Sequence, residues 1–380
     1  MSSVETLDLD AILHELGPVF EARSIELEAS DSFVADNYRV LREYGVFSAQ
    51  VPEDLGGFAV SHSAVANFLR QLAHHCPSTA LAVSMHQHLV SAAAKNHKDG
   101  KPGAALLEKV LAGELVLVST GANDWLDSGG EATKVEGGFR INAFKGFASG
   151  SPVADIAITS CAYDCPQDGP SVIHFPVSLK ADGVSKLDDW QTMGMRATGS
   201  QTLQFKDVFV PDESVGLKRA RGPFHPAFSV IVTVAMPLVM AVYVGVAEAA
   251  AKFAKAQACK RPADAIVALQ LGELENLLTT AQLALESMMS LANDLDFEPS
   301  AELASKILVR KSICANHVLL ACEKALEVSG GAGFFRKNGL ERLLRDAHAG
   351  QFHPLPEKRQ QMFTGRLAAG LSPVESSFGN

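Results

Sequence analysis

Near its end the chain reads Val328-Ser329-Gly330-Gly331-Ala332-Gly333-Phe334 and then Leu340-Glu341-Arg342-Leu343-Leu344-Arg345-Asp346-Ala347. A long helical pattern that stops on closely spaced glycines and restarts with an Arg-rich, Leu-periodic turn indicates a break that leaves backbone N–H groups open. Such a break suits a phosphate, although GGxG alone is more often an ordinary helix C-cap. The rest of the sequence has to decide between these two interpretations.

The spacing of apolar residues divides the chain into three regions. Residues 1–116 and 221–380 show helical spacing, and in the second region Leu271, Leu274 and Leu278 step by three and four residues. Residues 117–220 instead show short alternating runs broken by glycine and proline, such as Ile156-Ala157-Ile158-Thr159. The pattern therefore predicts a helical domain, a β domain and a second helical domain, in that order.

Composition narrows the class of partner. The chain has 380 residues, 47% of them apolar, so it can bury a large core. Its 43 acidic and 33 basic side chains give a formal charge of −10, the wrong sign for a general nucleic-acid or anionic-membrane binder. Six cysteines show no zinc-type spacing, and no signal peptide is visible. We expect a cytoplasmic protein without a metal site that acts on a small molecule.

One segment is long and apolar enough to span a bilayer. Residues 224–246 contain no Asp, Glu, Lys or Arg, and Lys218, Arg219 and Arg221 precede them as a basic flank. Pro237 and the smooth continuation into an Ala-rich helix argue against a membrane span. The sequence favours a buried core helix.

Several local motifs support a resemblance to a known family. Tyr44-Gly45-Val46-Phe47 is followed by Val51-Pro52-Glu53-Asp54-Leu55-Gly56-Gly57, and residues 138–149 read GFRINAFKGFAS. Gly194-Met195-Arg196-Ala197-Thr198 and Val208-Phe209-Val210-Pro211 come later. In this order the motifs resemble the acyl-CoA dehydrogenase superfamily of flavoproteins along nearly the whole chain. The resemblance implies an α+β, mostly helical fold with an N-terminal α-bundle, a middle β-barrel-like domain and a C-terminal four-helix bundle.

The resemblance also implies a cofactor and residues that contact it. A flavin ring has a polar edge and two apolar faces, so its site needs hydroxyl or backbone donors beside an aromatic side chain. By the resemblance, Phe147 takes the aromatic position, Ser149 the hydroxyl position beside N5, and Thr120 a contact to the pyrimidine end. Gly330, Gly331 and Gly333 would serve the FAD of a neighbouring subunit, so a homodimer or homotetramer is expected. FAD is the expected cofactor, with FMN as the alternative.

The residues that normally remove a proton in this family are missing. Pro354 stands where a glutamate base usually follows the Arg-Asp motif, and Ala235, Met236 and Pro237 stand where a second group of members carries it. Either His353 or Glu357 could replace the base. The Arg-x-x-Phe-Gly motif that usually reaches FAD across a dimer is also absent.

A His-Pro pair after the Arg-Asp motif also resembles the flavin monooxygenases of the same fold. The sequence Met85-His86-Gln87-His88 could supply a further histidine to their type of site. His86, Trp125 and Met236 are predicted to contact substrate. Both helical histidines could equally be packing residues, and Glu357 could simply pair with a basic neighbour on the surface.

Three activities follow from the resemblance. The leading one is FAD-dependent desaturation of an acyl thioester, with electrons passing to an acceptor flavoprotein. The alternative is a two-component monooxygenase that receives reduced flavin from a reductase. A non-catalytic relative of the same fold is the third interpretation, and retention of Phe147 and Ser149 argues against it.

Overall fold

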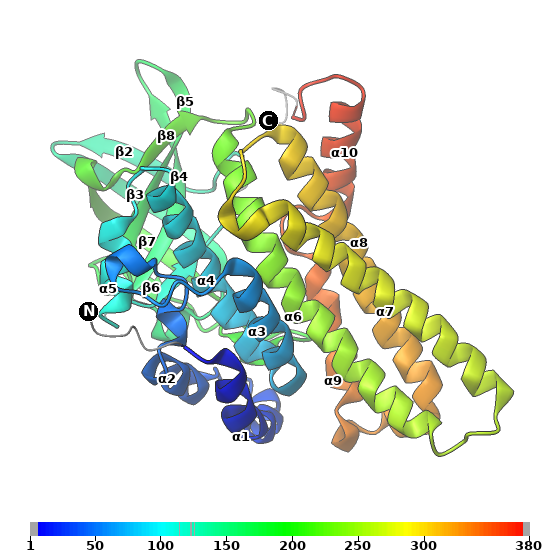
Figure 1. The fold of residues 1–380 in the computed structure, drawn as a ribbon. Coiled ribbons are helices and arrows are strands. Elements are labelled where there is room, and N and C mark those ends of the chain that lie inside the picture. Colours follow the sequence, from blue (N-terminus) through cyan, green and yellow to red (C-terminus); the bar gives the residue numbers. More distant parts are fainter. Residues whose placement is uncertain (1–6, 114, 122–123, 125, 375–380) are drawn as a thin grey trace.

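A computed structural model of the chain describes residues 7–113, 115–121, 124 and 126–374. The strands gather on one side of the molecule, and the long C-terminal helices extend away from them (Figure 1). The helices that precede the strands are α1 Leu9–Ser30, α2 Ala35–Glu43, α3 His62–His75, α4 Pro77–Lys98 and α5 Ala104–Leu111. The strands are β1 Leu117–Ser119, β2 Glu131–Val135, β3 Gly138–Ala148, β4 Ile156–Cys165, β5 Gly169–Ser178, β6 Val184–Lys186, β7 Gln201–Pro211 and β8 Leu217–Ala220. The helices that follow are α6 Pro226–Ala258, α7 Ala265–Ala292, α8 Ala301–Ser329, α9 Leu340–His348 and α10 Glu357–Ala368.

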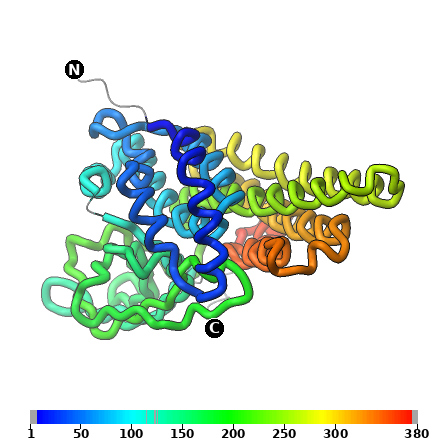
Figure 2. The backbone as a smooth tube through the Cα atoms, turned by 90° about the horizontal axis from the view of Figure 1, so that it is seen from below, coloured from blue at the N-terminus to red at the C-terminus, as the bar shows by residue number. Residues whose placement is uncertain are grey.

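This arrangement confirms the predicted fold class. It is mostly helical, with a central sheet and helical regions before and after it. Figure 2 shows that the end of α6 and the start of α7 project away from the strands and the N-terminal helices. The domain boundaries at residues 116 and 220 stay predictions, although the described strands all fall between Leu117 and Ala220.

The strands form one mixed sheet in the order β6-β7-β3-β2-β4-β5-β8, with β1 added in parallel to β4. β3 alternates buried and exposed residues along most of its length, as expected for a strand with one face on the core. In the antiparallel pair of β4 and β5, Ser160 lies opposite His174, which puts both side chains on the same face. The pairing thus brings two polar side chains to one face of the sheet.

The apolar run is the first part of α6, a helix of 33 residues. α6 is long and apolar enough to cross a membrane by composition, but 89% of its most apolar window is buried inside the protein. It packs against α3, α4, α7 and α8, so one helix contacts both helical regions. The prediction of a buried core helix agrees with this burial.

Close approach of α3 and α6 depends on Gly245. A Cβ at this position would lie 2.1 Å from the carbonyl oxygen of Arg70 and 2.9 Å from the Cβ of Ala73. Gly245→Ala should therefore destabilise the fold by about 1–3 kcal/mol, because neither contact can move without shifting a helix. Gly272→Ala on α7 is the matched control, since a Cβ there meets nothing within 4 Å. Urea unfolding of both variants checks this, and equal stabilities would contradict it.

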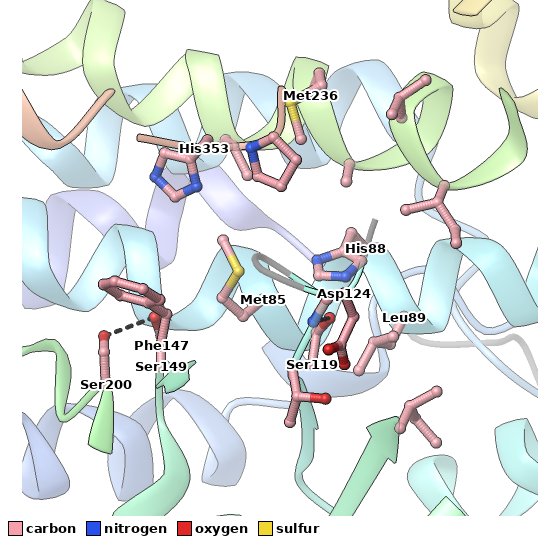
Figure 3. A pocket seen from close by; sticks show the side chains of 18 of the residues that line it. Met85, His88, Leu89, Ser119, Asp124, Phe147, Ser149, Ser200, Met236 and His353 are labelled. Atoms are coloured by element: carbon pink, nitrogen blue, oxygen red, sulfur yellow. Dashed lines mark hydrogen bonds between the residues drawn. The ribbon is translucent and has the colours of Figure 1, made fainter. Parts of the chain in front are cut away.

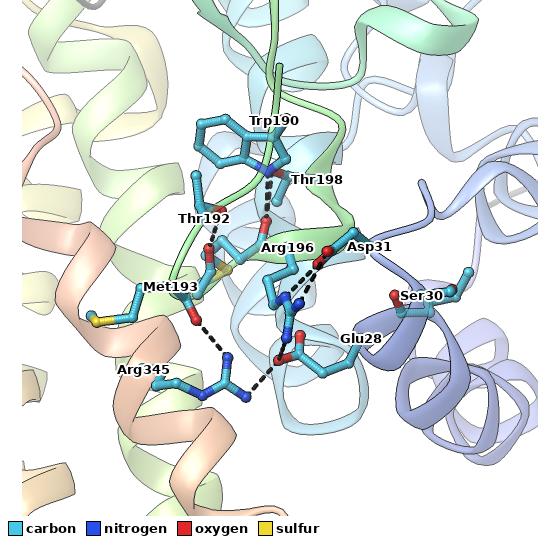
Figure 4. Close-up of polar contacts among 12 residues, drawn as sticks. Glu28, Ser30, Asp31, Trp190, Thr192, Met193, Arg196, Thr198 and Arg345 are labelled. Carbon is cyan, nitrogen blue, oxygen red and sulfur yellow. Dashed lines mark hydrogen bonds and ion pairs between the residues drawn. The ribbon is translucent and has the colours of Figure 1, made fainter. Parts of the chain in front are cut away.

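Ion pairs tie the three regions together (Figure 4). Arg345 on α9 donates to Glu28 of α1 and to the carbonyl oxygen of Met193, each at 2.5 Å. Arg196 donates to Asp31, just after α1. These contacts hold the segment from Trp190 to Thr198 in place, where Trp190 donates from its indole nitrogen to the carbonyl oxygen of Met195 at 3.1 Å.

Candidate active site

One cavity of about 330 Å³ lies between the strand ends, α4, α6 and the loop after α9 (Figure 3). This volume is in the usual range for a small-molecule site, about 300–1,000 Å³. Its apolar lining comes mainly from the two helices: Leu81, Met85 and Leu89 on α4, and Phe228, Ile231, Val232, Val234, Ala235, Met236 and Val239 on α6. Its polar side chains come mainly from the strand ends, so the cavity has one apolar side and one polar side.

The polar side includes a chain of hydroxyl groups that begins at Ser149. Ser149 Oγ lies 2.7 Å from Ser200 Oγ, which lies 2.6 Å from Thr198 Oγ1. Thr198 donates to the carbonyl oxygen of Met195 at 2.9 Å. A hydroxyl has one proton to donate, so Ser200 must donate to Thr198 and Ser149 to Ser200. Ser149 therefore presents a lone pair to the cavity, whereas the sequence suggested a donor.

Phe147 lies at the end of β3 and borders the same space. Its ring packs edge-on against Trp190, with the ring centroids 6.0 Å apart, and 48% of the residue is exposed. Its φ of 62° is unusual for a bulky residue, and backbone strain of this kind is concentrated at binding sites. Nearby, Thr120 donates to Thr159 at 2.7 Å, so it too lies on the polar side.

His353 enters the cavity from the loop between α9 and α10. Its Nε2 lies 2.7 Å from the hydroxyl oxygen of Tyr243 on α6. Burial, together with the charge of the nearby Lys311 ammonium, lowers the pKa of His353 to about 3. Lys311 also donates to the carbonyl oxygens of Gln351 and Leu355 at 3.4 and 3.2 Å, which fixes the loop on both sides of His353. The imidazole is therefore neutral at physiological pH and held in place.

His88 is a second neutral imidazole in the cavity, and its tautomer is fixed. Its Nδ1 lies 3.2 Å from the carbonyl oxygen of Ser84, which can only accept, so Nδ1 carries the proton. Nε2 is left as an acceptor on the cavity side. Burial lowers the pKa of His88 to about 4.

The predicted substrate contact His86 lies on the other side of α4 and has a structural role. Its Nε2 donates to the carbonyl oxygen of Phe47 at 2.9 Å, and its Nδ1 accepts from the backbone N–H of Leu117 at 3.0 Å. Both ring nitrogens are thus occupied, and His86 does not line the cavity. In place of His86, the structure puts His88 at the site.

Asp124 is the only carboxylate among the described residues that line the cavity, and none of them is Lys or Arg. Its Oδ2 accepts from the buried Lys145 ammonium at 2.7 Å, and its Oδ1 accepts from the backbone N–H of Gly129 at 3.0 Å. Both oxygens are therefore engaged. The protein itself thus holds the carboxylate, through one ion pair and one backbone hydrogen bond.

Other predicted site residues lie elsewhere. Glu357 begins α10, outside the cavity lining, and its carboxylate accepts from Lys358 at 3.3 Å and Gln361 at 2.6 Å. This places it away from any substrate in the cavity. Trp125 lies outside the described residues. The structure does bring Thr120, Phe147, Ser149, Met236 and His353 around one space.

The glycine segment, Gly330 to Gly333, forms a short helical turn directly after α8. It lies at the end of the bundle where α6 ends, since Arg261 donates to the carbonyl oxygen of Val328. It is not part of the cavity of its own subunit. A Cβ at Gly330 or Gly331 would meet nothing within 4 Å, so this backbone faces open space. That this segment binds the FAD of a neighbouring subunit stays a prediction.

Comparison with known proteins agrees with this arrangement. Residues 15–114 match the family described as "Acyl-CoA dehydrogenase, N-terminal domain", and residues 238–357 match "Acyl-CoA dehydrogenase, C-terminal domain". The chain belongs to the acyl-CoA dehydrogenase superfamily. Both matched segments flank the strands, and the cavity lies where the three parts of this superfamily member meet.

Relatives of this superfamily member include both oxygenating enzymes and dehydrogenases. Amino sugar nitrososynthase DnmZ of Streptomyces peucetius is 28% identical, over 90% of this chain and 88% of its own. Dibenzothiophene monooxygenase of Rhodococcus erythropolis is 25% identical, over 90% and 89%. The mitochondrial isovaleryl-CoA dehydrogenase of Oryza sativa subsp. japonica is 24% identical, over 90% and 85%.

Among solved structures, KijD3 in complex with FMN and dTDP-3-amino-2,3,6-trideoxy-4-keto-3-methyl-D-glucose superposes with a TM-score of 0.86. It is 25% identical to this chain, and the match covers 96% of this chain and 93% of KijD3. The fold is therefore shared with a protein whose structure contains a flavin.

Proposed function

We propose that this protein is a flavin-dependent monooxygenase that oxygenates an uncharged, largely apolar small molecule. The observation that carries the proposal is the chemistry of the cavity. Among the described residues, its ionisable groups are neutral imidazoles, the phenol of Tyr243, whose pKa is raised by burial, and one carboxylate, which is engaged by Lys145 and Gly129. Desaturation needs an available carboxylate at the substrate Cα, whereas oxygenation needs groups that accept and donate single protons.

The residues of the cavity fit a flavin ring. Phe147 offers an aromatic face, Thr120 lies on the polar side, and Ser149 offers a lone pair. A lone pair at Ser149 suits a ligand N–H, which a reduced flavin carries at N5. When bound, the reduced flavin would supply the two electrons that let one oxygen atom of O₂ enter the substrate and the other leave as water. We propose a separate reductase as its source.

The histidines would handle the protons. His88 Nε2 can accept a proton from a substrate N–H or O–H, since its Nδ1 already donates to Ser84. His353, in the loop after α9, is paired with the Tyr243 hydroxyl and can both donate and accept a proton. The low pKa values keep both rings neutral, so neither attracts an anion in place of the substrate. The apolar side chains of α4 and α6 exclude water from the same space.

Desaturation of an acyl thioester is the competing function, and the family match and the dehydrogenase relative speak for it. Pro354, which stands in the usual base's position, itself lines the cavity. No other described lining residue except the engaged Asp124 carries a carboxylate. A non-catalytic relative is supported less, because the cavity retains the flavin-facing residues.

An anaerobic titration separates the two enzyme classes. Protein loaded with oxidised flavin should keep its absorbance near 450 nm, roughly the usual flavin band, when acyl thioesters of short, medium and long chain are added without oxygen. Reduced flavin on the protein, mixed with O₂, should instead support oxygenation of uncharged, apolar substrates. Dithionite is the control that shows that the bound flavin can be reduced. Bleaching by any thioester would support the dehydrogenase and contradict the proposal.

A further inference from the structure

His174 on β5 lines the cavity and is bonded to a buried arginine. Arg219 on β8 donates from Nε to His174 Nε2 at 3.1 Å. Arg219 is only 5% exposed. It also donates to the carbonyl oxygens of Leu126 and Ala220 at 2.7 and 3.1 Å, and its guanidinium lies 4.6 Å from the ring centroid of Phe228. These contacts fix the guanidinium in one position.

The arginine determines which nitrogen of His174 carries the proton. Burial lowers the pKa of Arg219 to about 10, so the guanidinium stays charged at neutral pH and can only donate. His174 Nε2 must therefore be an acceptor, and in the neutral ring the proton is on Nδ1. Burial, with the charge of Arg219, lowers the pKa of His174 to about 4, which keeps the ring neutral. Nδ1 has no hydrogen-bond partner among the described residues.

The surroundings favour an oxygen atom as the ligand of this N–H. Ser160 lies opposite His174 in the sheet, and its hydroxyl is 2.9 Å from that of Ser128. The charged groups near His174 are Arg219 and Lys145, and Asp124 offsets the Lys145 charge. The nearby His225 accepts from the backbone N–H of Ala227 at 3.2 Å. His174 is thus a donor polarised by the cation behind it.

We propose that His174 Nδ1–H, oriented by Arg219, forms a binding subsite for a carbonyl or anionic oxygen of a ligand in the cavity. His174 is the complement of His88, because both rings carry the proton on Nδ1 but different nitrogens are left for the cavity: Nδ1–H of His174 donates and Nε2 of His88 accepts. The subsite rests on the proposed flavin and substrate cavity. Its oxygen ligand belongs either to the pyrimidine edge of the flavin or to a carbonyl of the substrate.

Two substitutions separate donation to a ligand from support of Arg219. Asparagine places an amide N–H near the Nδ1 position but offers nothing to Arg219, whereas glutamine places an amide oxygen near Nε2 for Arg219 and loses the Nδ1 donor. His174→Gln should therefore weaken the oxygen ligand about threefold to tenfold, the effect of one lost hydrogen bond, and His174→Asn should bind nearly as wild type. A purely structural role for His174 predicts the reverse order.

The measurements are FMN affinity by fluorescence quenching and the ratio of oxindole to indole affinity, two flat probes that differ by a carbonyl group. Weaker FMN binding in His174→Gln, with an unchanged ratio, assigns the oxygen to the flavin. A ratio that falls toward one, with unchanged FMN affinity, assigns it to the substrate. Unchanged values for both, or His174→Asn as weak as His174→Gln, would overturn the proposal.

The tautomer itself can be read without any ligand. Nitrogen-15 and proton correlation spectra of the protein with labelled histidine should show the Nδ1–H form for His174 and, as an internal comparison, the same form for His88. An Nε2–H form at His174 would overturn the subsite even if the protein oxygenates its substrate. Conversely, a protein that binds no FMN but shows the Nδ1–H form would refute the proposed function and leave the donor in place.

Discussion

Replacement of His353 by alanine should lower the rate of substrate oxygenation by about 10²–10⁴-fold, the usual contribution of a positioned proton donor or acceptor. The His353 ring is hydrogen-bonded to the Tyr243 hydroxyl, and its loop is held on both sides by Lys311. Without the imidazole, reduced flavin should still reduce O₂, but the O₂ should be released as hydrogen peroxide and not be used to oxygenate the substrate. Product and peroxide formed per reduced flavin, measured together, check the result.

Two further variants make this test specific. Tyr243→Phe removes the hydroxyl 2.7 Å from His353 and keeps the ring, so it should give a smaller loss of the same kind. His14→Ala, on the exposed face of α1, should leave the yield of product unchanged. A His353→Ala protein with wild-type turnover and no extra peroxide would remove His353 from the mechanism.

The local sequence was enough to predict the fold and part of the site. Phe147 lies near the end of β3, whose alternating pattern is clear, and Ser149 directly follows that strand. Thr120 directly follows the short strand β1. Their positions follow from local structure, so a motif could place them. His353 was identified because it stands one residue before Pro354, where the usual base is missing.

Other site residues could not be found because they depend on contacts between distant segments. Tyr243 lies within an apolar helix and looks like core until the fold brings it to His353, 110 residues away in sequence. His174 looks like an ordinary strand residue until β8 places Arg219 beside it. Trp190 lies in an irregular segment with no periodic pattern to locate it.

The choice between His86 and His88 shows the same limit at short range. Residues two positions apart on a helix point about 200° apart, so only one of them can face a given cavity. Both lie in a helix that is buried almost all round, so the sequence pattern does not indicate which side of the helix faces the cavity. Glu357 was chosen by residue type, but as the first residue of α10 it is directed to neighbours on its own helix.

Acidification should destabilise this protein strongly between pH 7 and pH 5. Five imidazoles, three of them buried and two half-buried, have their pKa lowered by desolvation. The pKa falls to about 4 in His62, His86, His88 and His174 and to about 3 in His353. In the unfolded chain their pKa returns to the ordinary 6.5, so below that value the unfolded state binds more protons. Stability is therefore lost as the pH falls from about 6.5 toward 4. Buried Asp346 opposes this, because burial raises its pKa to about 7 and the folded state takes up its proton first.

The five imidazoles outweigh the one carboxyl group, and the net loss from pH 7 to pH 5 should be on the order of 5 kcal/mol. That is a large share of the 5–15 kcal/mol typical of a folded domain, so acid unfolding should begin well above the usual carboxylate range. Urea unfolding at half-unit pH steps measures the slope. His62→Asn removes one of the buried imidazoles and should reduce the slope, whereas His14→Gln on the exposed face of α1 should leave it unchanged. A flat profile from pH 7 to pH 5 would mean that these imidazoles reach protons in the folded state, and with that the argument for neutral rings in the cavity would fail.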